Sequence, residues 1–175
     1  MANTYALIAS NTLGSNTASV TFSSIPQTYT DLILKISTRN DDTGKTETVL
    51  LRVNGLTTNV YSSAYFYASG TFTSYSRENA QTNINDGIRG NGNTATSNVF
   101  SNNEIYIPNY TSSDSYKPIS VFNAAEHNAT DNNWIGVSAN LVNTSDAISS
   151  ITLSNTTTKV FLTGSSFFLY GIKNS

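Results

Sequence analysis

Apolar and polar residues alternate along much of the chain, most clearly in the stretch ASVTFSSIPQTYTDLILKI at residues 18–36. Within it, residues 18–22 and 32–36 each repeat an apolar residue at every second position, the period of a strand with one buried face. Pro26 lies between these arms and has no N–H to donate to a sheet. We therefore predict two strands joined by a structured corner. The predicted inward residues are Ala18, Val20, Phe22, Leu32, Leu34 and Ile36.

The same pattern predicts further strands along the rest of the chain. They cover residues 4–9, 47–54, 98–108, 116–125, 134–142, 147–154 and 161–173. In two of them we expect a particular set to face inward: Val49, Leu51 and Val53 in one, and Ile135, Val137, Ala139 and Leu141 in the other. The last strand is apolar on both sides, which favours a central position in a sheet.

Two regions lack a clear period. Residues 60–75 are crowded with aromatic side chains and broken by Gly70, so we expect an irregular turn of helix or a loop, followed by a short strand. Residues 79–96 are rich in Gly, Asn and Thr, which is typical of loops. We expect at most one strand there, near residues 84–88.

Together these segments make about nine or ten short strands, separated by turn signals, without a long amphipathic helix or an internal repeat. Such spacing is typical of a two-layer β protein. We predict an all-β fold, a two-sheet antiparallel β-sandwich of jelly-roll type. At 175 residues we expect a single domain spanning 1–175.

Composition excludes several classes of function. Charged residues make up only 11% of the chain, whereas Ser, Thr and Asn account for 73 of its 175 residues. The nine Lys and Arg residues are scattered and the net charge is −2, which argues against nucleic acid as a partner. We expect no membrane span, because no run of about 18 apolar residues occurs, and no secretory signal is visible. Cysteine is absent, so disulfides and thiolate metal sites are excluded.

Five segments, taken in order, resemble a family of virion structural proteins of tailed bacteriophages, familiar from phages of marine bacteria and cyanobacteria. They are ASVTFSSIPQTYTDLILKI at 18–36, LLRVNG at 50–55, EIYIPNY at 104–110, AISSITL at 147–153 and SSFFLYGI at 165–172. The resemblance implies a β-sandwich used on the capsid surface or in tail appendages, and it brings no catalytic residues. Residues 60–96 fit the family pattern least.

Residues that suggest chemistry are few. His127 is the sole histidine, and we expect a surface or turn position rather than a metal or catalytic site. The acidic pair at 41–42 and the stretch NINDG at 83–87 suggest calcium, but neither has the spacing of a calcium loop. Glu104 and Glu126 are interpreted as solvated strand positions rather than a glycosidase pair. We therefore predict no enzyme activity, no cofactor and no metal.

The aromatic cluster is the remaining candidate site. Tyrosine is enriched at protein interfaces and also stacks on sugars. The predicted platform consists of Tyr61, Tyr65, Phe66, Tyr67, Phe72 and Tyr75. These residues either cap the sandwich, form an interface or bind a saccharide.

We expect a noncatalytic capsid decoration or accessory protein on the virion surface. Its expected partners are other virion proteins and further copies of itself, with a homotrimer as the assumed state. The alternative is a receptor- or carbohydrate-binding module of a tail appendage, whose partner would be a host surface glycan.

Overall fold

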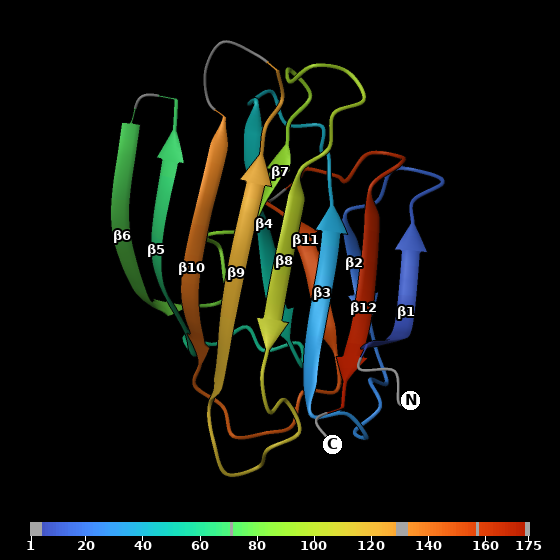
Figure 1. Ribbon diagram of the computed structural model, residues 1–175, viewed down its shortest axis with the longest axis vertical. Coiled ribbons are helices and arrows are strands. Elements are labelled where there is room, and N and C mark those ends of the chain that lie inside the picture. Colours follow the sequence, from blue (N-terminus) through green and yellow to red (C-terminus); the bar gives the residue numbers. More distant parts are fainter. Residues whose placement is uncertain (1–4, 71, 129–132, 157, 174–175) are drawn as a thin grey trace.

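The computed structural model describes residues 5–70, 72–128, 133–156 and 158–173, and these form twelve β-strands and no helix (Figure 1). The strands are β1 (Tyr5–Thr12), β2 (Ser19–Phe22), β3 (Asp31–Ser37), β4 (Thr46–Val53), β5 (Tyr61–Ser69), β6 (Phe72–Gln81), β7 (Arg89–Asn91), β8 (Asn102–Ile107), β9 (Lys117–Ala125), β10 (Trp134–Val142), β11 (Ile151–Asn155) and β12 (Ser166–Ile172). The all-β prediction is confirmed. The described residues contain more strands than expected, because residues 60–75, predicted to be mostly irregular, form β5 and the start of β6.

Two antiparallel sheets pack face to face, with the apolar core between them. The large sheet has the order β1-β12-β3-β8-β9-β10-β5-β6, and the small sheet has the order β2-β11-β4-β7. The sheets differ in width, so β5 and β6 extend past the small sheet at one side of the molecule (Figure 1). The core includes residues from both sheets but none of the described residues of β6.

The corner predicted around Pro26 is confirmed, and it carries the chain from one sheet to the other. β2 belongs to the small sheet and β3 to the large one. The Tyr110 hydroxyl donates a hydrogen bond to the Pro26 carbonyl, and Gln27 Nε2 donates to the Ile148 carbonyl at 3.0 Å. Both contacts come from distant parts of the chain, so the corner is fixed by tertiary structure.

The faces predicted for the central strands are largely confirmed. Val49, Leu51 and Val53 on β4 are fully buried. On β12, Phe167 and Leu169 are also fully buried, and the strand lies between β1 and β3. Burial alternates along both strands because each has one face against the other sheet, although β12 is apolar in sequence on both sides.

The prediction of irregular structure for residues 60–75 was wrong. The segment forms β5 and the start of β6, a hairpin with a register shift near Tyr61 and a turn at Gly70 that has a positive φ of 59°. Most of the hairpin has no second sheet over it, so neither side needs to be uniformly apolar. The pattern used to predict strands is therefore absent from the sequence.

The orientation predicted for β10 was also wrong. Ile135 and Val137 are about half exposed, at 53% and 50%, whereas Ser138 and Asn140 are buried. The strand alternates as predicted, but its apolar side faces solvent. Polar side chains are accepted inside because they hydrogen-bond there, as when Asn140 Nδ2 donates to Ser138 Oγ at 2.9 Å.

His127 is fully buried, contrary to the surface position expected. It lies two residues after the end of β9, where Asn91 Nδ2 on β7 donates to the carbonyl of the neighbouring Glu126 at 3.4 Å. The strand expected near residues 84–88 is also shifted. Ile84 makes an isolated bridge to Leu51, and the paired strand is β7.

Candidate functional site: an aromatic stack and an exposed apolar patch

The structure does not bring the six predicted platform residues together. Tyr61 is buried in the core, where its hydroxyl accepts from the Val53 N–H at 3.2 Å and donates to the Leu56 carbonyl at 3.2 Å. The other five divide between the two faces of the hairpin, because side chains alternate along a strand. Tyr65, Tyr67 and Phe72 lie on the inner face, and Phe66 and Tyr75 lie on the outer face.

The inner-face rings form a stack centred on Tyr67. Its ring lies 3.8 Å from that of Trp134 with an interplanar angle of 11°, and 5.8 Å from that of Tyr65. Phe72 meets Tyr67 edge-on at 5.7 Å. The guanidinium carbon of Arg89 lies 4.0 Å from the centre of the Trp134 ring, a cation–π contact. Sequence reasoning missed Trp134 and Arg89, although Trp134 is the sole tryptophan in the sequence.

The side chains of this stack pack against one another. A saccharide stacks on an open ring face, and both faces of Trp134 are covered, one by Tyr67 and the other by Arg89. Burial lowers the pKa of Arg89 from its ordinary value. The most exposed ring of the group is Phe72, at 54%.

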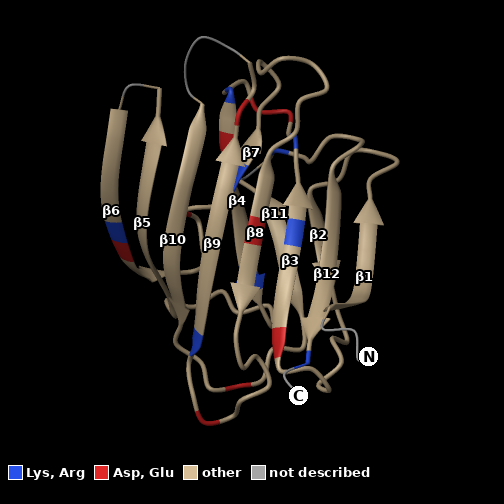
Figure 2. Ribbon diagram, viewed as in Figure 1, with Lys and Arg blue, Asp and Glu red and all other residues tan. Residues whose placement is uncertain are grey.

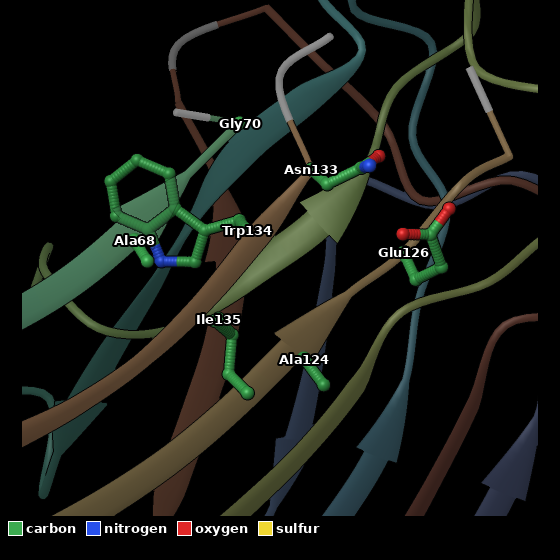
Figure 3. A pocket seen from close by; sticks show the side chains of 7 residues that line it. All are labelled: Ala68, Gly70, Ala124, Glu126, Asn133, Trp134 and Ile135. Carbon is green, nitrogen blue, oxygen red and sulfur yellow. The ribbon is translucent and has the colours of Figure 1, made fainter. Parts of the chain in front are cut away.

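An open hollow of about 320 Å³ lies beside the stack, at the ends of β5, β9 and β10 (Figure 3). The Trp134 ring lies near Ala68, away from the Glu126 carboxylate and the Asn133 amide (Figure 3). Glu126 is exposed, and its Oε1 accepts the Asn128 N–H at 2.6 Å. The lining residues are Ala68, Gly70, Ala124, Glu126, Asn133, Trp134 and Ile135.

The outer face of the large sheet has an exposed apolar patch over β9, β10, β5 and β6, which we call the outer patch. Val137 is at its centre, because it is the register partner of both Phe66 and Phe122. Phe66 is in turn the partner of Tyr75. The large members of the outer patch, all more than a third exposed, are Phe66, Tyr75, Phe122, Ile135, Val137 and Leu141.

The outer patch contains little charge. β5 and β10 have no charged residue, and the single charged residue of β9 is Lys117 at its start (Figure 2). On β6, the exposed Arg77 is the register partner of Ala64 and lies on the same face as Tyr75. On the β8 side, the patch meets the surface pair of Lys35 and Glu104, whose charged atoms lie 3.1 Å apart. Contiguous exposed apolar surface of this kind is typical of interaction sites.

The residues considered for catalysis lie apart. Glu104 on β8 is the register partner of Phe122 on β9. Glu126 lies four residues after Phe122, which is about 13 Å at a strand rise of about 3.3 Å per residue. That is wider than the spacing of about 5–9.5 Å in glycosidase pairs. Among the described residues, no three His, Cys, Asp or Glu side chains group as metal ligands. Within the same residues, no helix has the length and hydropathy to cross a membrane.

No known protein family, curated protein or solved structure matches this chain.

Proposed function

We propose that this chain is a noncatalytic bacteriophage virion protein, a decoration or accessory subunit on the particle surface, and that the outer patch is its attachment surface. The virion assignment rests on the five ordered segments that resemble phage structural proteins. The attachment role rests on one observation, the half-exposed apolar side chains centred on Val137.

The size of the outer patch suits the centre of a protein interface. Four strands have three gaps of about 4.8 Å between them, and Ile135 to Leu141 on β10 are six steps of about 3.3 Å, which together cover about 300 Å². A stable interface buries about 800 Å² on each partner, with an apolar centre and a polar rim. Thr73 on β6 and Ser120 on β9 are exposed on the same face and contribute to such a rim.

The low charge of this face predicts how the attachment responds to salt. Salt screens interactions between exposed charges and has little effect on apolar burial. We therefore expect purified particles to retain the protein through washing in concentrated salt. Complete loss of the protein in the wash would contradict attachment through the outer patch.

Val137→Glu is expected to reduce incorporation into particles at least tenfold, because it places an unpaired charge at the centre of the proposed interface. The variant or the wild-type chain is supplied during infection, and copies per purified particle are counted by quantitative mass spectrometry. Leu7→Glu is the matched control. Leu7 is 56% exposed on the same sheet but lies on β1, at the opposite edge.

The control variant should be incorporated like the wild type, and both variants should keep the wild-type Tm, since both positions are on the surface. Equal incorporation of the two variants would remove the outer patch from the proposal. Absence of the wild-type protein from particles would overturn the virion assignment itself.

The second candidate function is a receptor- or carbohydrate-binding module, for which the hollow beside Trp134 is the supporting observation. Tyr67→Ala separates the two functions. We expect Tyr67→Ala to lower the free energy of unfolding by about 2 kcal/mol, because half-buried stacking is lost. The variant and the wild type should give the same signals on a glycan array. Saccharide binding that is lost in Tyr67→Ala with stability unchanged would favour the second candidate function.

A further inference from the structure

The interior beneath the β5–β6 hairpin is polar. Asn140 on β10 and Ser63 on β5 are register partners, and Ser63 is also the partner of Glu78 on β6, so the three side chains lie in one row on the inner face. Ser63 and Asn140 are only 3% and 5% exposed. Core positions of this kind are usually apolar, and polar groups placed there need partners.

The segment at residues 82–88 closes over this row. Gly87 has a positive φ of 85°, and a Cβ at this position would lie 2.2 Å from Ser138 Oγ. Glycine therefore permits the close approach, and Ser138 Oγ donates to the Asp86 carbonyl at 3.5 Å. The approach brings Asp86 beside Glu78, and Asn85 Nδ2 donates to Glu78 Oε2 at 3.1 Å.

Five side-chain oxygens in this region are buried without a hydrogen-bond partner among the described residues. Asp86 is the clearest of them, because its side chain is charged, its exposure is only 7% and its Oδ2 has no donor. A buried carboxylate without a donor is costly unless a cation or a proton neutralises it. The five atoms are Ser63 Oγ, Asn83 Oδ1, Asn85 Oδ1, Asp86 Oδ2 and Asn140 Oδ1.

The charged groups that face Asp86 are Glu78 and Arg89. Burial and then the nearby charge of Glu78 raise the pKa of Asp86 to about 6, and the opposing influence of Arg89 is smaller. The Arg89 guanidinium is only partly engaged elsewhere. Its Nη1 donates to Thr48 Oγ1 at 2.6 Å and the group lies over Trp134, while its Nε is buried without an acceptor among the described residues. Two adjacent carboxylates are therefore left with several oxygen acceptors around them.

We propose that Glu78, Asn83, Asn85 and Asp86 form a calcium-binding site between the β5–β6 hairpin and the 82–88 segment, with Ser63 and Asn140 lining its inner side. Ca²⁺ takes six to eight oxygen ligands, including carboxylates, amide carbonyls and water, in flexible geometry. Two carboxylates balance its charge. Mg²⁺ requires a tighter octahedron and fits this mixed, irregular set less well.

Calcium chloride added to EDTA-treated protein at pH 7.5 is expected to raise Tm by about 5 °C or more, since a ligand that binds only the folded state stabilises it. Magnesium chloride at equal concentration should shift Tm less. Asp86→Asn and Glu78→Gln should each remove the calcium shift. The control Asp114→Asn changes an exposed loop carboxylate and should keep it.

Isothermal titration of the wild type with calcium chloride gives a second measurement, in case either variant fails to fold. The proposal is overturned if calcium produces neither heat nor a Tm shift in the wild type, or if Asp86→Asn responds like Asp114→Asn. The site is independent of the proposed function, because the readouts involve no particle.

Discussion

Arg39→Met is expected to lower the free energy of unfolding by about 4 kcal/mol, as judged from charge-assisted hydrogen bonds worth about 1.5–3 kcal/mol each. Arg39 is 7% exposed, and its guanidinium donates four hydrogen bonds to backbone carbonyls of a single loop. Nη1 reaches Thr96 at 2.7 Å and Val99 at 3.2 Å, and Nη2 reaches Asn93 at 3.0 Å and Ala95 at 2.9 Å. The variant removes every donor of the guanidinium and leaves the four carbonyls, of which that of Ala95 belongs to a buried residue, without this partner.

Urea unfolding measures the loss, and Arg39→Lys provides the graded control. The ammonium of lysine is a compact group that lacks the planar fork, so it satisfies fewer of the four carbonyls. We expect about half the destabilisation of the methionine variant, by the same count of lost bonds. A methionine variant within about 1 kcal/mol of the wild type would show that the loop holds its shape without Arg39.

The second large effect is expected at Lys117, which is fully buried at the start of β9. Its Nζ donates to the carbonyls of Ser112 at 2.7 Å, Ser115 at 2.6 Å and Ser145 at 3.1 Å, so all three ammonium donors are used. These bonds join the loop before β9 to the loop after β10. Lys117→Met keeps most of the apolar stem and leaves three carbonyls unpaired, for an expected loss of about 3 kcal/mol.

Lys35→Met is the matched control for Lys117→Met. Lys35 lies on β3 with its side chain 53% exposed and is paired with Glu104 on the surface. Exposed pairs of this kind contribute between about 0 and 1 kcal/mol. Thermal unfolding of the two variants should therefore differ clearly, and equal Tm values would refute the role assigned to Lys117.

The strand predictions are correct where each face of a strand has one environment, either the core or the solvent. Leu51 and Leu34 face the other sheet, so their strands show a regular apolar alternation that is legible in the sequence. β10 alternates equally well, yet it faces the other way. The period separates the two faces of a strand but does not show which face packs against the core. In β10 the polar Asn140 is buried and the apolar Val137 is exposed, the reverse of the usual pattern.

The candidate sites depend on pairings that no local pattern contains. The stretch at residues 83–87 lacks calcium-loop spacing, and the other oxygens of the proposed site come from Glu78, Ser63 and Asn140 on three strands. Arg39 precedes the acidic pair at 41–42 in the sequence, and only the path of residues 93–99 around its guanidinium makes it interior. Such groups become visible once the register is known.

The unequal width of the two sheets separates the part of the molecule that maintains the fold from a part that contributes little to the core. β6 adds nothing to the described core, and β5 adds only Tyr61. Most substitutions at outward positions of this hairpin therefore leave the sandwich intact, since surface changes usually cost within about 0.5 kcal/mol. A protein lineage can therefore change the surface of the β5–β6 hairpin without changing the core between the two sheets.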